Sequence, residues 1–112
     1  MTNIWQVLRF ARDVRLEKNE RDMSIARYYY KVWGEVQGVG FRRRAASIAG
    51  EIGLTGWVKN VYDGSVELEV QGEEEELRRF LSRIEQACGI DIESVKMREM
   101  AVKSGEASFS IR

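Results

Sequence analysis

Hydrophobic and polar residues alternate along residues 28–36 and again along residues 66–70, which predicts two half-buried β-strands. Residues 54–60 and 92–102 are expected to form two further strands. Apolar residues at alternate positions of the segment 107–111 suggest a short fifth strand. The pattern therefore predicts a sheet built from segments spread over most of the chain.

Apolar residues recur at helical spacing in two segments between the predicted strands. The stripe of the first helix consists of Phe41, Ala45, Ile48, Ala49 and Ile52. The stripe of the second helix consists of Leu77, Phe80, Leu81 and Ile84. Gly53 is expected to end the first helix, and the glutamates at 73–76 are expected to open the second, at the end where the helix dipole favours acids. Asp63-Gly64 is a hairpin turn signal between the second and third strands.

The order of these elements is strand, helix, strand, strand, helix, strand. This βαββαβ order predicts an α+β fold of the ferredoxin-like type, a sandwich in which two helices cover one face of an antiparallel sheet. Ahead of it, apolar residues at positions 4, 7, 8, 11 and 14 fall on one helical face, and a polar run follows. We therefore expect an N-terminal helical extension, amphipathic and charged, at residues 1–22 and one folded domain at residues 23–112.

Composition excludes several kinds of chemistry. The 112 residues contain no histidine, which excludes a Ser-His-Asp triad, a Cys-His pair and an HExxH zinc helix. Cys88 is the only cysteine, so no internal disulfide can form, and we expect a cytoplasmic location. Eighteen basic residues balance eighteen acidic ones, and no apolar run is long enough to span a bilayer. We therefore expect neither nucleic acid nor membrane as a partner.

Residues 34–42, with the sequence GEVQGVGFR, lead from a predicted strand into a predicted helix. A loop of this kind can direct several backbone N–H groups at one point, and with the helix N-terminus it forms a cradle for an anion. Gly38 and Gly40 allow backbone conformations that other residues resist. The alternative is a plain strand-to-helix turn.

Three consecutive arginines, Arg42, Arg43 and Arg44, follow this loop at the start of the helix. Cations at a helix N-terminus oppose the helix dipole, and a bound anion would remove that penalty. Successive helical residues point about 100° apart, so we expect only one of the three to enter the cradle. Arg42 lies nearest the loop and is the predicted one, whereas Arg43 and Arg44 are expected on the solvated surface.

The motif GxVQGVxFR at 34–42, the motif GWVKN at 56–60 and the motif DGSVExxxxG at 63–72 together resemble the signature of the acylphosphatase family. The sequence FSIR at 109–112 is also similar to the end of that family's domain. The resemblance covers residues 26–112 and implies the ferredoxin-like fold that the pattern predicts independently.

The resemblance also implies a role for particular residues. The segment that would hold the phosphate of the substrate consists of Gln37, Gly38, Val39, Gly40, Phe41 and Arg42. Arg42 would be the catalytic arginine, and Asn60 would hold the attacking water. Topology agrees, since the first two strands of this fold run parallel with another strand between them, so that Arg42 and Asn60 meet at one edge of the sheet about 10 Å apart. The alternative for Asn60 is a turn residue.

This resemblance implies an enzyme that hydrolyses acyl phosphates, with no cofactor and no metal. When an acyl phosphate is hydrolysed, the leaving group is a carboxylate, which is a weak base and needs no strong general acid. An arginine, oriented N–H groups and an asparagine therefore suit the reaction. The expected partners are a small acyl phosphate and inorganic phosphate, and the expected state is a monomer.

Two alternative functions stay open on the sequence, and a metal site is a weaker candidate. An acylphosphatase-like module could bind a phosphorylated ligand without turnover, and retention of both Arg42 and Asn60 favours the enzyme. Trp33 and Trp57 could stack on RNA bases, which the neutral charge disfavours. Glu73 to Glu76 could bind a metal, although a solvated helix start explains them more simply.

Overall fold

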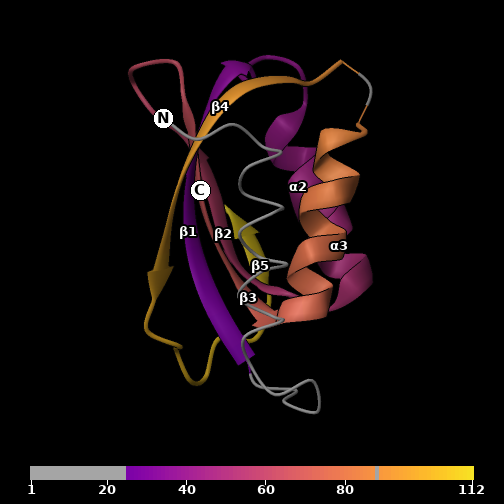
Figure 1. Cartoon of the computed structure of the whole chain (residues 1–112), viewed down its shortest axis with the longest axis vertical. Coiled ribbons are helices and arrows are strands. Elements are labelled where there is room, and N and C mark those ends of the chain that lie inside the picture. Colours follow the sequence, from indigo (N-terminus) through magenta and orange to yellow (C-terminus); the bar gives the residue numbers. More distant parts are fainter. Residues whose placement is uncertain (1–24, 88) are drawn as a thin grey trace.

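The computed structural model describes residues 25–87 and 89–112, which form one sheet with two helices (Figure 1). The strands are β1 (Ile25–Glu35), β2 (Thr55–Asn60), β3 (Val66–Glu73), β4 (Asp91–Met100) and β5 (Phe109–Ile111). The helices are α2 (Phe41–Ile52) and α3 (Glu74–Glu85). The predicted extension at 1–22 and Cys88 lie outside the described residues.

The strands are ordered β4-β1-β3-β2-β5 in the sheet. The pairs β1–β3, β1–β4 and β2–β3 are antiparallel, which leaves β1 and β2 parallel to one another with β3 between them. The ferredoxin-like prediction is therefore confirmed. The short fifth strand is also present, and β5 pairs in parallel with β2, so the sheet is mixed at this edge.

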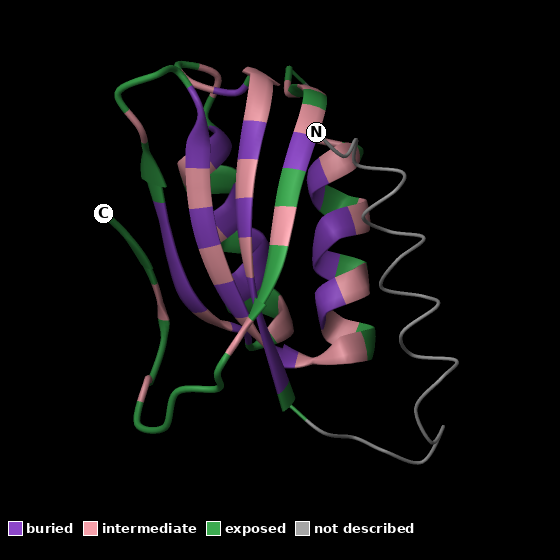
Figure 2. Cartoon of the chain, turned by 60° about the vertical axis from the view of Figure 1, so that its left-hand side comes forward, coloured by how far each residue is buried: buried purple, intermediate pink, exposed green. Residues whose placement is uncertain are grey.

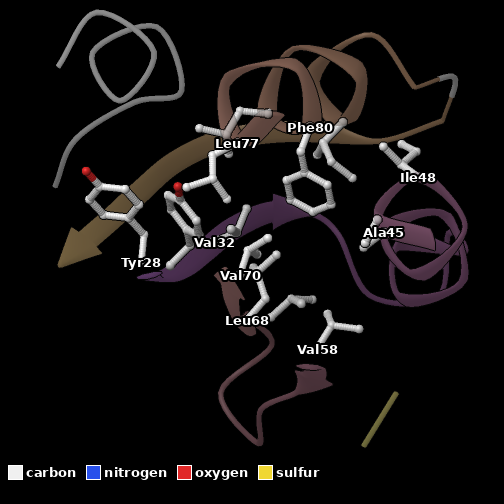
Figure 3. Close-up of a cluster of buried hydrophobic side chains, with 14 of the residues drawn as sticks. Tyr28, Val32, Ala45, Ile48, Val58, Leu68, Val70, Leu77 and Phe80 are labelled. Carbon is white, nitrogen blue, oxygen red and sulfur yellow. The ribbon is translucent and has the colours of Figure 1, made fainter. Parts of the chain in front are cut away.

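Both helices pack on one face of the sheet, and the core lies between the two layers (Figure 1). In Figure 3, Leu68 and Val70 of β3 face Phe80 of α3 across this core. Buried and intermediate residues alternate along β3, as the two-residue period of a strand requires (Figure 2). Neither helix in the described part of the chain is long and apolar enough to cross a membrane.

The helix boundaries follow the predicted signals. Gly53 caps the C-terminus of α2 in the left-handed conformation, and its N–H donates to the carbonyl of Ala49. At the start of α3, the side chains of Glu73 and Glu76 each accept a hydrogen bond from the other's backbone N–H. This capping box gives the glutamates a structural role in the fold.

The other face of the sheet contains a fully buried arginine that the sequence analysis did not single out. Arg27 lies between the core residues Ala26 and Tyr28, so its side chain points away from the helices. Its Nε donates to Glu69 at 2.7 Å and its Nη1 donates at 2.7 Å to Glu106, which lies in the connection between β4 and β5. Burial alone lowers the pKa of Arg27, but the hydrogen bonds to Glu106 and Glu69 outweigh it and raise this pKa.

Replacing Arg27 should destabilise the fold strongly, because Glu69 and Glu106 would lose the cation that compensates them. For Arg27→Met we expect a loss of about 3 kcal/mol in the free energy of unfolding, measured by urea denaturation at pH 7. The control is Arg79→Met at an exposed position of α3, where we expect a change of about 0.5 kcal/mol or less. Equal losses in the two variants would contradict the prediction.

Candidate active site

A cavity of about 220 Å³ opens where β1 ends and α2 begins. The loop after β1 and the first turn of α2 form most of its wall, and β2 and β5 contribute one residue each. The residues that line it are Val36, Gly38, Gly40, Phe41, Arg42, Arg43, Asn60 and Ile111. Segments far apart in the sequence therefore meet at one edge of the sheet.

The loop itself needs its glycines for backbone conformation. Gly38 has a φ of 75° and Gly40 a φ of 82°, both in the left-handed region. A Cβ at either position would meet no atom within 4 Å, so space is not the reason for glycine here. These two left-handed residues bend the chain just before the helix. A loop with this backbone conformation can direct successive N–H groups at one point.

The N-terminus of α2 differs from that of α3. Its N-cap is Gly40, which has no side chain and makes no capping hydrogen bond, and no acid lies in its first turn. The α3 N-terminus instead has a capping box and three glutamates in its first turn. Because the first backbone N–H groups of a helix lack partners within the helix, the α2 terminus is left able to bind an anion.

Gln37 joins the loop to the turn that follows β2. Its side-chain Nε2 donates to the carbonyl of Val61 at 2.7 Å and to the carbonyl of Ser65 at 2.8 Å. The predicted phosphate-loop residue thus directs its amide at the protein backbone. This double hydrogen bond fixes the loop relative to Asn60, which directly precedes Val61.

The turn after β2 is held in place by Asp63. The carboxylate of Asp63 accepts hydrogen bonds from the hydroxyl and the N–H of Ser65 and pairs with Lys31 at 3.0 Å. These contacts with Ser65 and Lys31 lower the pKa of Asp63 to about 2. The turn to which Gln37 donates is therefore held by Asp63, Ser65 and Lys31 of β1, with Asp63 ionised at neutral pH.

Most of the predicted site residues lie together. Arg42 is half-buried and Asn60 is exposed, and both line the cavity together with Gly38, Gly40 and Phe41. Gln37 and Val39 are not among the lining residues.

Arg43 requires a correction. It is exposed, as expected, but it also lines the cavity, so Arg42 is not the only arginine there. Three successive residues of the first turn, Phe41, Arg42 and Arg43, line the cavity, so the 100° spacing of helical residues does not limit it to one arginine.

Ile111 also lines the cavity, and the sequence analysis missed its contribution. The similarity of FSIR to the end of the family's domain was the available signal. Within residues 25–87 and 89–112, no group of three Asp, Glu, His or Cys side chains is placed to hold a metal ion.

The family model described as "Acylphosphatase" matches residues 28–111, which is most of the chain. This chain belongs to the acylphosphatase family. The match includes the loop of 34–42, Asn60 and the β5 strand, so every residue that lines the cavity falls within it.

Relatives in this family match over nearly their full length. The chain is 43% identical over 86 residues to an acylphosphatase of Clostridium acetobutylicum, a match that covers 76% of this chain and 94% of the relative. An acylphosphatase of Moorella thermoacetica is 41% identical over 91 residues, with 80% and 97% covered. The crystal structure of acylphosphatase from Bacillus subtilis superposes with a TM-score of 0.72 at 34% identity and covers 78% of this chain and 98% of that one.

Removing the amide of Gln37 should loosen the site of this family member. Gln37→Met keeps the side-chain volume but loses both hydrogen bonds, so we expect a loss of about 1–3 kcal/mol in the free energy of unfolding. We also expect weaker binding of inorganic phosphate, measured by calorimetry, because the loop is no longer fixed to the turn. The control is Gln86→Met on the surface after α3, which should change neither quantity. Unchanged stability and phosphate affinity in Gln37→Met would show that the tether is dispensable.

Proposed function

We propose that this protein is an acylphosphatase that hydrolyses acyl phosphates to a carboxylate and inorganic phosphate. The observation that carries the proposal is that Arg42 and Asn60, from different elements, line one cavity over the uncapped N-terminus of α2. A water molecule attacks phosphorus, the bond from phosphorus to the carboxylate oxygen breaks, and both protons of the water stay with the phosphate product.

The phosphoryl group binds to the segment 37–42 in this proposal. The backbone N–H groups of this loop and of the first turn of α2 supply oriented dipoles, and Arg42 supplies a planar guanidinium that can hold two oxygens at once. Arg43, at the same cavity, adds positive charge at its rim. Asn60 accepts a hydrogen bond from the attacking water and fixes its direction.

The reaction suits a site of this composition. The leaving carboxylate is a weak base, so the enzyme needs no histidine as general acid, and charge can be neutralised by an arginine and a helix N-terminus. We therefore propose hydrolysis without a metal ion. A phosphate monoester releases an alkoxide, which is a far poorer leaving group, and should be a poor substrate.

The proposed catalytic unit is the domain at residues 23–112, because all residues of the cavity belong to it. We place residues 1–22 outside the catalytic machinery. We propose a monomer in the cytoplasm that acts on a small acyl phosphate, without nucleic acid or membrane as a partner. The balance of eighteen basic and eighteen acidic residues disfavours nucleic acid.

The direct test of the function is a hydrolysis assay with an acyl phosphate in the presence of EDTA. We expect acetyl phosphate and benzoyl phosphate to be cleaved at the same rate with and without the chelator. We expect a phosphate monoester such as 4-nitrophenyl phosphate to be cleaved far more slowly. Activity that EDTA abolishes and a divalent ion restores would overturn the metal-independent mechanism.

Replacing Arg42 and replacing Asn60 should have different kinetic effects. Arg42 holds the phosphoryl group in both the ground state and the transition state, so Arg42→Ala should weaken inhibition by inorganic phosphate and lower kcat. Asn60 acts on the water, so Asn60→Ala should lower kcat by about 10²–10³ and leave phosphate inhibition nearly unchanged.

The control for these variants is Arg44→Ala, since Arg44 is exposed and does not line the cavity. Thermal melts establish that each variant is folded. Normal turnover by Asn60→Ala would contradict the water-positioning role, and Asn60 would then be a turn residue only. If Arg43→Ala is inactive while Arg42→Ala is active, the catalytic arginine is the second of the three.

A further inference from the structure

We propose that Ile111 contacts the acyl group of the substrate and makes the enzyme favour large apolar acyl groups over small ones. The proposal rests on the proposed function and deepens it, because it concerns the half of the substrate that the phosphate loop does not recognise. An acyl phosphate has a charged end and a carbon end, and the two ends need different surroundings.

The cavity offers an exposed apolar side chain for the carbon end. Val36 and Phe41 line the cavity but are only 1% and 2% exposed, so their side chains belong to the core. Ile111 is 49% exposed and therefore presents most of the apolar side-chain surface available to a ligand there. An apolar group that covers Ile111 removes this surface from water, which favours binding.

The strand register places Ile111 beside the proposed reaction centre. In the parallel pairing of β2 with β5, Ile111 lies opposite Val58, and the N–H of Arg112 donates to the carbonyl of Val58 at 2.8 Å. Asn60 lies two residues further along β2, on the same face as Val58 because side chains alternate. An acyl group whose phosphate is held by the loop thus has Ile111 as a neighbour.

The short β5 strand is anchored on both sides, so Ile111 has a defined position. Phe109 packs against Phe80 of α3, with ring centroids 6.3 Å apart. The guanidinium of Arg112 lies over the ring of Trp57 at 4.8 Å. Ahead of the strand, Glu106 is fixed by Arg27. A side chain held in this way needs little rearrangement to contact a ligand.

The test compares benzoyl phosphate with acetyl phosphate in Ile111→Ala. We expect kcat/KM for benzoyl phosphate to fall about tenfold, kcat/KM for acetyl phosphate to change by about twofold or less, and phosphate inhibition to stay the same. Ile111→Val should lie between wild type and Ile111→Ala. The matched control is Ile25→Ala, since Ile25 is 46% exposed at the opposite end of β1 and should leave the ratio of the two substrates unchanged.

Binding of two non-hydrolysable analogues separates this proposal from the proposed function. Calorimetry should show that wild type binds benzoylphosphonate more tightly than acetylphosphonate and that Ile111→Ala loses this preference, whether or not the enzyme turns over acyl phosphates. An unchanged preference, or an equal loss of affinity for both analogues, would overturn the role of Ile111. Should Ile111→Ala fail to fold, the same comparison with Ile111→Val decides the matter.

Discussion

The side-chain amide of Gln37 connects two segments that no backbone ladder joins. Because β3 separates β1 from β2 in the sheet, the loop after β1 and the turn after β2 have no strand pairing with each other. Gln37 spans this gap with hydrogen bonds to Val61 and Ser65. The relative position of Arg42 and Asn60, on which any shared chemistry depends, is therefore set by one side chain as well as by the sheet.

The two helices differ in how the backbone N–H groups at their N-termini are paired. The glutamates at the start of α3 supply hydrogen-bond acceptors and favourable charge, so the N-terminus of α3 is stabilised without a bound anion. The start of α2 has a glycine cap, and three arginines follow Phe41 in the helix, which is electrostatically unfavourable without an anion. The contrast within one chain supports an anion site at α2 more strongly than the glycine loop does alone.

Periodicity predicted the fold well because one face of each element is buried against a common core. The spacing of Phe41, Ala45 and Ile48 and the signal at Gly53 located α2 at its observed bounds. The burial of Arg27 could not be predicted in this way. Its face of the strand is normally solvated, and its cover comes from Glu106, 79 residues further along the chain. The alternation of β1 carries no information about that contact.

Backbone topology was enough to predict that Arg42 and Asn60 lie at one edge of the sheet, whereas contacts that depend on side-chain direction were missed. The order of strands brings Arg42 and Asn60 to one edge, but the double contact of Gln37 and the presence of Arg43 at the cavity depend on where long side chains point. Ile111 depends on a parallel pairing at the edge of the sheet. Because Glu106 precedes β5 and is held by Arg27, the face of the sheet remote from the helices helps to fix the wall of the cavity. The segment from Glu106 through β5 therefore contributes both to the stability of the fold, through Arg27, and to the shape of the cavity, through Ile111.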